Sequence, residues 1–382
     1  MSGWDGLPLR DDLRGLSPYG APQLEVPFRL NTNENPYPPS PELVAALTAA
    51  CAQAAASLNR YPDRDALALR EELAAYLTAE SAAPGQVVAV DQVWAANGSN
   101  EILQQLCQAF GGPGRVGLAF EPTYTMHGLI ALATATGWVR GERDAEFRVD
   151  VPAARAAIAE HAPSLVFLCS PNNPTGTALE LETIRELHDA APGILIVDEA
   201  YAEFRRAGVP SAVTLLPECP RLVVTRTMSK AFALAGARVG YLAAAPGVVE
   251  ALQLVRLPYH LSALTQAAAR VALAHSAELL ASVEALRVQR DRLLNELPAL
   301  GCPAVPSDAN FVLFQVPGDQ RRIWEALLEH GVLVRDVGLA GWLRVTAGTP
   351  GEMDAFLSEL GSLMKVAGSG SGAGMSSRIG AA

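Results

Sequence analysis

Lysine is scarce in this sequence, although arginine is plentiful. Of the 29 basic residues only Lys230 and Lys365 are lysines, and 40 acidic residues outnumber all the basic ones. The net charge of −11 disfavours a nucleic-acid partner, because binding to phosphates requires basic patches. No apolar run approaches the roughly 18 residues of a membrane span, and the first residues lack the apolar core of a secretory signal. We therefore expect neither a nucleic-acid nor a membrane partner.

Disulfide and metal-binding patterns are also missing. The five cysteines are odd in number, scattered and without a CxxC pair, so we expect reduced packing residues and a cytoplasmic location. The six histidines form no HxxxH or HExxH cluster, so we expect no metal site. No GxGxxG opens a helix after the first predicted strand, which disfavours a nicotinamide-dependent dehydrogenase.

Apolar segments of strand length alternate with helical patterns over much of the chain. Half of the residues are hydrophobic and 18% are charged, which is typical of compact globular proteins. Several strand candidates are continuously apolar, as expected for strands covered on both faces. This alternation predicts an α/β fold with a large, doubly wound mixed sheet. The candidates are 93–98, 115–120, 164–174, 193–201, 221–227 and 238–244.

The alternation of strand and helix patterns ends at about residue 260. A long helical region there precedes apolar segments near 311–316, 332–336 and 342–348, a pattern typical of a smaller α+β domain. The predicted division is an N-terminal arm over 1–40 that joins the small domain, a large domain over 41–262, a small domain over 263–365, and a flexible tail over 366–382.

Polar side chains follow several of the predicted strands. Asn173 lies in the turn PNNPTG, and Asp198 ends the strand ILIV, with Tyr201 three residues later. Sites in doubly wound sheets gather at the carboxyl ends of strands, so we expect these side chains to lie together. The turn NGSNE opens a helix whose first amide groups suit an anion. After the strand LVVTRT come Thr227, Ser229, Lys230 and Arg238.

One ligand would use all of these groups, namely an aldehyde-bearing pyridine with a phosphate arm. A primary amine forms an imine with an aldehyde and a guanidinium does not, which explains a lysine at position 230. A carboxylate such as Asp198 keeps a pyridine nitrogen protonated, so that the ring accepts electrons. Hydroxyls, an arginine and helix-terminal amides bind a phosphate. Each group alone is an ordinary turn or surface residue, so the interpretation depends on their joint order.

The order NPTG, DEAY and SKAFALAGAR resembles the fold type I pyridoxal-phosphate aminotransferases over almost the whole chain, to about residue 365. The resemblance implies that the large domain binds pyridoxal 5'-phosphate, with Lys230 forming the imine and also acting as general base and acid. Asp198 would pair with the pyridine nitrogen. Tyr201 and Asn173 would bind the ring oxygen, and Tyr124 would stack on the ring. The phosphate would be held by Gly98, Ser99, Asn100, Thr227, Ser229 and Arg238.

Further segments narrow the resemblance to the histidinol-phosphate aminotransferase family. They are LSPYG, LNTNENPYPPSP, NRYPD, VLVRD and LRVTAGT. This resemblance implies a homodimer in which Tyr61 reaches the cofactor phosphate of the neighbouring active site. It implies reversible amino transfer between L-histidinol phosphate and 2-oxoglutarate, giving imidazole acetol phosphate and glutamate, in histidine biosynthesis. The implied substrate-binding residues are Tyr19, Asn173, Arg335 and Arg344.

Some alternatives stay open at this point. Another fold type I aminotransferase, acting on aromatic amino acids, or a phospho-amino-acid decarboxylase would share the cofactor residues and differ only in the pocket. A transcription regulator built on such a domain is disfavoured, because residues 1–40 are too short and proline-rich for a DNA-binding helix-turn-helix. Asn100 stands where an aspartate is common in the family, which leaves the role of its side chain open. We expect His127 to be a structural neighbour of Tyr124.

Overall fold

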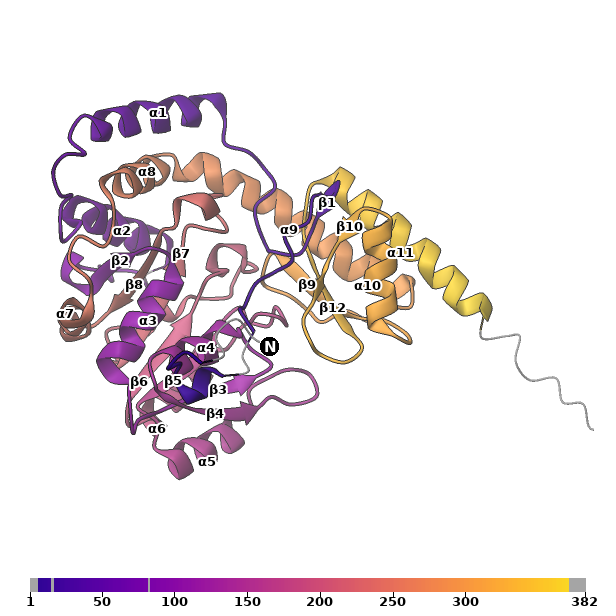
Figure 1. Cartoon of the computed structure of the whole chain (residues 1–382), viewed down its shortest axis with the longest axis horizontal. Coiled ribbons are helices and arrows are strands. Elements are labelled where there is room, and N and C mark those ends of the chain that lie inside the picture. The colour runs from indigo at the N-terminus through magenta and orange to yellow at the C-terminus, as the bar shows by residue number, and fades with distance from the viewer. Residues whose placement is uncertain (1–5, 15–16, 82, 371–382) are drawn as a thin grey trace, which may run out of the picture.

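A seven-stranded mixed sheet forms the centre of the larger part of the structure (Figure 1). In spatial order its strands are β2 (Val93–Ala96), β8 (Gly240–Ala244), β7 (Leu222–Thr227), β6 (Ile194–Asp198), β5 (Leu165–Cys169), β3 (Val116–Glu121) and β4 (Gly137–Glu142). β8 is antiparallel to both of its neighbours, and the other pairs are parallel. The computed structural model describes residues 6–14, 17–81 and 83–370, with side chains as far as residue 365. The predicted α/β class with a large mixed sheet is confirmed.

Helices cover both faces of this sheet, which explains why its central strands are apolar on both sides. Alternate residues of a strand point to opposite faces. On one face, Ile196 of β6 and Val223 of β7 belong to a core that includes side chains of α3 (Ser99–Phe110), α4 (Met126–Ala133) and α7 (Pro246–Val255). On the other face, Val197 and Val224 belong to a core shared with α2 (Leu67–Glu80), α5 (Val151–His161) and α6 (Leu181–Ala190).

The six strands predicted from apolar segments of the larger part are all present, but β4 was not among them. β4 is the edge strand next to β3. None of its residues is buried, and its sequence, GWVRGE, includes Arg140 and Glu142. An edge strand with one covered face carries no continuous apolar run, so the signal used for the central strands did not apply.

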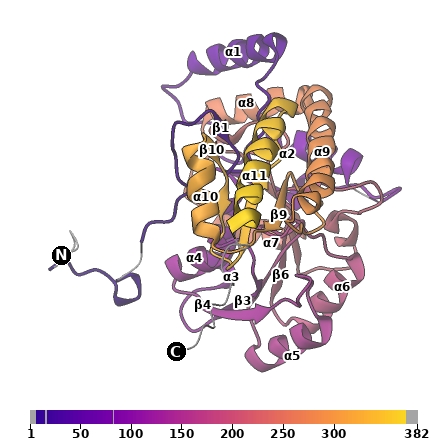
Figure 2. The ribbon, with the colours of Figure 1, turned by 90° about the vertical axis from the view of Figure 1, so that its right-hand side faces the viewer.

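The smaller part contains a three-stranded antiparallel sheet with the order β11 (Arg335–Asp336), β12 (Trp342–Thr346) and β9 (Phe311–Gln315). Figure 2 shows α10 (Gln320–Glu329) and α11 (Pro350–Gly370) on the side of this part that faces the viewer. β1 (Phe28–Arg29) pairs in parallel with β10 (Val332–Leu333), which attaches the N-terminal segment to the smaller part. The predicted strand over 332–336 is therefore two short strands in two different sheets.

The long helical region after residue 262 consists of two helices, α8 (Ala263–Ala274) and α9 (Ser276–Ala299). Although α8 falls within the predicted small domain, it packs on α1 (Pro41–Ala55) and α2, and its buried residues belong to the core of the larger part. An amphipathic pattern shows that one face of a helix is buried, but it does not show which core that face packs into. The sequence therefore did not reveal that α8 packs on the larger part. α9 packs on β9 and α11 of the smaller part and also contacts α8, and so connects the two parts.

The C-terminal helix α11 extends to Gly370, five residues into the predicted tail, and residues 371–382 lie outside the described residues. In the part of the chain that the structure describes, no helix combines the length and apolar character needed to cross a bilayer.

Candidate active site

A cavity of about 390 Å³ lies at the carboxyl ends of β5, β6 and β7, and residues of the smaller sheet complete its wall. Position in the sheet explains this location, because the loops that follow parallel strands meet at one edge. Most of the predicted site residues line the cavity. They are Tyr19, Ser99, Asn100, Tyr124, Asn173, Asp198, Tyr201, Thr227, Ser229, Lys230, Arg238, Arg335 and Arg344.

Lys230 follows β7, and its side chain reaches the N-terminal segment. The Nζ amine donates a hydrogen bond to the carbonyl oxygen of Thr32 at 2.8 Å. Burial, together with the positive charges of Arg344 and Arg238, lowers the pKa of Lys230 to about 8, against the opposing charge of Glu34. An amine with this pKa is partly neutral near pH 7, so it can act as a nucleophile and accept a proton.

Asp198, the last residue of β6, has a buried carboxylate with two side-chain partners. Thr225 Oγ1 donates to Asp198 Oδ1 at 3.1 Å, and His127 Nε2 lies 3.2 Å from Asp198 Oδ2. The His127 ring contacts Tyr124 edge-on, as expected, and stacks on Phe167. His127 is therefore more than a neighbour of Tyr124, because it also fixes the orientation of the Asp198 carboxylate. The two residues are 71 positions apart, and no local sequence motif predicted their contact.

Tyr201, Asn173 and Arg344 form a connected polar group in the wall of the cavity. The Tyr201 hydroxyl accepts from Asn173 Nδ2 at 3.4 Å, and Arg344 Nη1 donates to Asn173 Oδ1. Arg344 Nη2 donates to the carbonyl of Asn31 at 2.8 Å, and its Nε finds no partner among the described residues. Burial lowers the pKa of Arg344 to about 10 and raises that of Tyr201 to about 12.

The loop after β7 and the start of α3 form a cradle of hydrogen-bond donors. Arg238 Nη1 donates to Ser229 Oγ at 3.3 Å, and Thr227 Oγ1 donates to Ser229 Oγ at 2.9 Å. Gly98, at the N-terminus of α3, has φ +84°, and a Cβ there would lie 2.6 Å from Arg238 Nη2. Gly98 itself is outside the cavity lining, but only a glycine lets the guanidinium approach the helix start so closely. Helix amides, hydroxyls and a guanidinium together suit a phosphate.

Tyr61 is the second predicted site residue, after Gly98, that does not line the cavity. Its side chain is 79% exposed and stacks on Tyr259, with 4.3 Å between the ring centroids. Tyr19, by contrast, lines the cavity although it is half exposed. The Asn100 side chain accepts from the Tyr124 hydroxyl at 3.3 Å, which is a role that its position in the turn did not reveal.

The N-terminal segment 31–34 also lines the cavity, although none of its residues was predicted as a site residue. The polar run NTNEN between Leu30 and Pro36 was a usable signal, because polar groups in a proline-rich arm without regular structure need hydrogen-bond partners elsewhere. Within the ranges that the structure describes, no group of three His, Cys, Asp or Glu side chains is placed to hold a metal ion.

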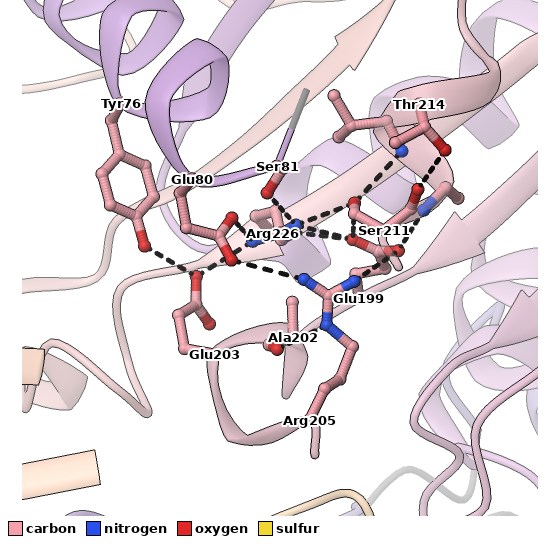
Figure 3. A network of polar contacts seen from close by, with 12 residues as sticks. Tyr76, Glu80, Ser81, Glu199, Ala202, Glu203, Arg205, Ser211, Thr214 and Arg226 are labelled. Carbon is pink, nitrogen blue, oxygen red and sulfur yellow. Dashed lines mark hydrogen bonds and ion pairs between the residues drawn. The ribbon is translucent and has the colours of Figure 1, made fainter. Parts of the chain in front are cut away.

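A buried ionic network lies behind the site, on the other face of the β6 and β7 ends (Figure 3). Arg226, fully buried on β7, contacts Glu199 at 2.8 Å, Glu203 at 3.1 Å and Glu80 at 3.2 Å. Although burial opposes it, the charges of Arg226 and Arg205 hold the pKa of Glu199 below its ordinary value. The network joins the ends of α2, β6 and β7, and so fixes the strand ends that carry the cavity residues.

Comparison with known sequences identifies close relatives over nearly the whole chain. Residues 26–360 match the family described as aminotransferase class I and II. A histidinol-phosphate aminotransferase from Frankia casuarinae is 68% identical over 361 residues, which cover 94% of this chain and 90% of the relative. One from Thermobifida fusca is 61% identical over 356 residues, which cover 93% of this chain and 95% of the relative.

Solved structures share the fold. The crystal structure of histidinol-phosphate aminotransferase from Sinorhizobium meliloti in complex with pyridoxal-5'-phosphate has a TM-score of 0.80 and 25% identity, covering 90% of this chain and 92% of that chain. A tetra mutant of Thermus thermophilus aspartate aminotransferase has a TM-score of 0.77 and 26% identity, covering 93% of this chain and 99% of that chain. Because enzymes named for different substrates share this backbone, the fold alone does not specify the substrate.

Proposed function

Because the chain belongs to the class I and II aminotransferases, we propose that it transfers an amino group between L-histidinol phosphate and 2-oxoglutarate, with pyridoxal 5'-phosphate as cofactor. It has the fold type I architecture of these enzymes. The 68% identity to a histidinol-phosphate aminotransferase supports this choice of substrate. The observation that carries the proposal is the convergence of Lys230, Asp198 and two arginines, Arg335 and Arg344, on one cavity.

The donor set of the cavity fits pyridoxal phosphate. A Cβ at Gly98 would fill the cradle, so the glycine keeps space open there. Helix amides, hydroxyls and the Arg238 guanidinium are then available to bind a phosphate. When bound, the cofactor supplies an aldehyde that combines with amines and a ring that withdraws electrons from the substrate carbon. We assign the phosphate to Gly98, Ser99, Asn100, Thr227, Ser229 and Arg238.

The remaining cofactor residues are assigned by their chemistry. Asp198 would keep the ring nitrogen protonated, and its contacts to Thr225 and His127 hold the carboxylate in one orientation. Tyr201 and Asn173 would bind the ring oxygen, and Tyr124 would stack on the ring face.

Lys230 is the residue to which we assign proton transfer. Its Nζ, when free and neutral, would accept the proton from the substrate carbon and later give it back. A base is most effective when its pKa lies near the working pH, and the pKa of Lys230 is about 8. The Thr32 carbonyl, 2.8 Å from Nζ, restricts where the free amine rests.

Two arginines would bind the anionic ends of both substrates. Arg335 of β11 and Arg344 of β12 lie directly opposite each other in the antiparallel register, and both line the cavity. Histidinol phosphate carries a phosphate monoester and no α-carboxylate, whereas glutamate carries two carboxylates. A pair of planar guanidinium forks accepts either kind of oxyanion, which suits an enzyme that must hold both. Tyr19 and Asn173 complete the proposed substrate pocket.

We also propose a homodimer that works in the cytoplasm. Tyr61 is 79% exposed and lies outside its own cavity, as expected of a residue that serves the neighbouring active site. Leu254 and Leu257, near the Tyr61–Tyr259 stack in sequence, are also exposed large hydrophobic residues and would be covered in a dimer. Five free cysteines fit a reducing compartment.

The test is amino transfer from L-histidinol phosphate to 2-oxoglutarate, measured as glutamate formed. Lys230→Ala should abolish it, and threonine phosphate and aromatic amino acids serve as competing substrates. Arg335→Ala should raise KM for histidinol phosphate more than KM for 2-oxoglutarate, because the phosphate carries more charge than a carboxylate. Preferred turnover of an aromatic amino acid, or carbon dioxide released from threonine phosphate, would overturn the proposed substrate. An unchanged KM for both substrates would remove Arg335 from the pocket.

A further inference from the structure

A second amide reaches the hydroxyl of Tyr201 from a segment far away in the sequence. Asn33 Nδ2 donates to Tyr201 OH at 2.9 Å, which is shorter than the 3.4 Å contact from Asn173. Asn33 is buried and comes from the N-terminal segment, 168 residues before Tyr201. We infer that Asn33 is a positioning residue, which directs the proton of the Tyr201 hydroxyl into the cavity, toward the ring oxygen of the cofactor. This inference rests on the proposed function.

The direction of the hydrogen bonds follows from one backbone group. The N–H of Asn33 can only donate, and its acceptor is Thr346 Oγ1 at 3.1 Å. The Thr346 hydroxyl keeps its own proton to donate, and it lies 3.0 Å from Asn33 Oδ1. Because Oδ1 is the acceptor on that side, the amide turns its Nδ2 toward Tyr201. The Tyr201 oxygen therefore accepts, and its single proton remains free to donate elsewhere.

The backbone of Asn33 is held as firmly as its side chain. Its φ of +56° is a left-handed conformation, which asparagine tolerates better than most residues. Asn310 Nδ2 donates to its carbonyl oxygen at 3.1 Å, and the preceding residue, Thr32, accepts from Lys230. Asn33 thus contacts both parts of the structure, through Thr346 on β12 and through Tyr201 after β6. The side-chain amide cannot rotate without breaking both of its hydrogen bonds.

The free proton matters once the cofactor is bound. A hydroxyl that donates to the ring oxygen would favour the ionised form of that oxygen. It would also lower the pKa of the Lys230 nitrogen when that nitrogen is joined to the cofactor. If the amide were reversed, Tyr201 would donate to Asn33 instead, and this effect would be lost. The charged and titratable groups that act on Tyr201 are Arg344 on β12, Asp198 on β6 and Cys169 on β5. A substitution at Asn33 leaves all three in place.

Asn33→Asp is the sharpest test, because it keeps the shape and the left-handed backbone but replaces the Nδ2 donor by an acceptor. The holoenzyme's near-visible absorption is titrated with pH, and the midpoint of its band shift reports the pKa at the Lys230 nitrogen. We expect the midpoint of Asn33→Asp to rise by about one pH unit, close to the effect of Tyr201→Phe, since a charge-assisted hydrogen bond is lost. Asn35→Asp, which adds the same charge two residues away, is the matched control and should shift the midpoint by less than half as much.

Two further variants keep the inference falsifiable. If Asn33 acts through Tyr201, adding Asn33→Asp to Tyr201→Phe should shift the midpoint no more than Asn35→Asp does. Thr346→Val removes the hydroxyl that orients the amide, and it should raise the midpoint even if Asn33→Asp fails to fold. Equal shifts with and without the Tyr201 hydroxyl, or an unchanged midpoint in both single variants, would overturn the role of Asn33. Absence of any near-visible band in the unaltered holoenzyme would instead overturn the proposed function and this inference with it.

Discussion

Lys230 should combine with pyridoxal phosphate at neutral pH far faster than an exposed lysine does. Its pKa is about 8, whereas an unperturbed lysine titrates near 10.4. At pH 7 about one-tenth of Lys230 is neutral, compared with roughly one part in 2,500 of an ordinary lysine. Since only the neutral amine attacks an aldehyde, the difference is worth about 200-fold in reactive amine.

The chain contains its own control for this prediction. Lys365, the other lysine, is exposed on α11. Enzyme stripped of cofactor would be mixed with pyridoxal phosphate over a series of pH values, quenched with borohydride at short times, and mapped by peptide mass. The neutral fraction grows as pH rises through the pKa, so adduct formation at Lys230 should rise steeply to about pH 8 and then level off. Labelling at the exposed Lys365 should be far slower at pH 7.

Arg344→Met tests the cause of the low pKa. Arg344 is the largest contributor after burial, so its loss should move the Lys230 midpoint to higher pH. Arg322→Met, at a surface arginine whose side chain is 85% exposed, should leave the midpoint unchanged. A wild-type midpoint at or above that of an ordinary lysine would refute the reasoning. So would equal labelling of Lys230 and Lys365 at pH 7.

Three more outcomes follow from the geometry. Gly98→Ala places a methyl group 2.6 Å from Arg238 Nη2 at φ +84°, so titration of the apoenzyme should show Kd for pyridoxal phosphate raised by about tenfold, with Gly247→Ala unchanged. Arg226→Met removes the closest cation from the buried Glu199 and Glu203 and leaves Arg205, 3.9 Å from Glu199, as the remaining one, so denaturant melts at pH 8 should show a loss of about 3–5 kcal/mol. That loss should shrink toward pH 5, because the uncompensated carboxyls have raised pKa values and protonate there; a pH-independent loss would contradict it. Finally, Lys230→Ala and Tyr61→Ala enzymes, each inactive or weak alone, should regain about a quarter of full activity when mixed and refolded together, and no recovery would exclude a shared site.

The central strands and the main chemical groups of the cavity could be predicted from sequence for the same reason. Strands buried on both faces are continuously apolar, and the residues that end them are then conspicuous polar groups, as with Asp198 after ILIV. Lys230 was conspicuous for a different reason, since lysine is almost absent elsewhere. Edge strand β4 lacked such a signal, because only one of its faces is covered. The packing of α8 also lacked one, because its sequence does not show which core its buried face packs into.

The contacts that orient the site were harder to predict. His127 meets Asp198 across 71 residues, and Asn33 meets Tyr201 across 168 residues. Each partner is an ordinary polar residue in its local sequence, and only the folded chain shows that their atoms lie within hydrogen-bonding distance. A sequence pattern identifies groups with distinctive chemistry, whereas their orientation depends on residues that are chemically unremarkable.

The alternation along β6 and β7 also protects the assembly of the fold against misalignment. Asp198 and Thr225 point to the cavity face, while the adjacent Glu199 and Arg226 point to the buried ionic network. If the two strands slipped by one residue, one of these polar groups would face an apolar neighbour and the Arg226 cation would lose its carboxylates. Nearly uniform aliphatic strands would otherwise tolerate such an error at little cost. The ion pairs behind the site thus make the native register of β6 and β7 more stable than a slipped register, whether or not a ligand is bound.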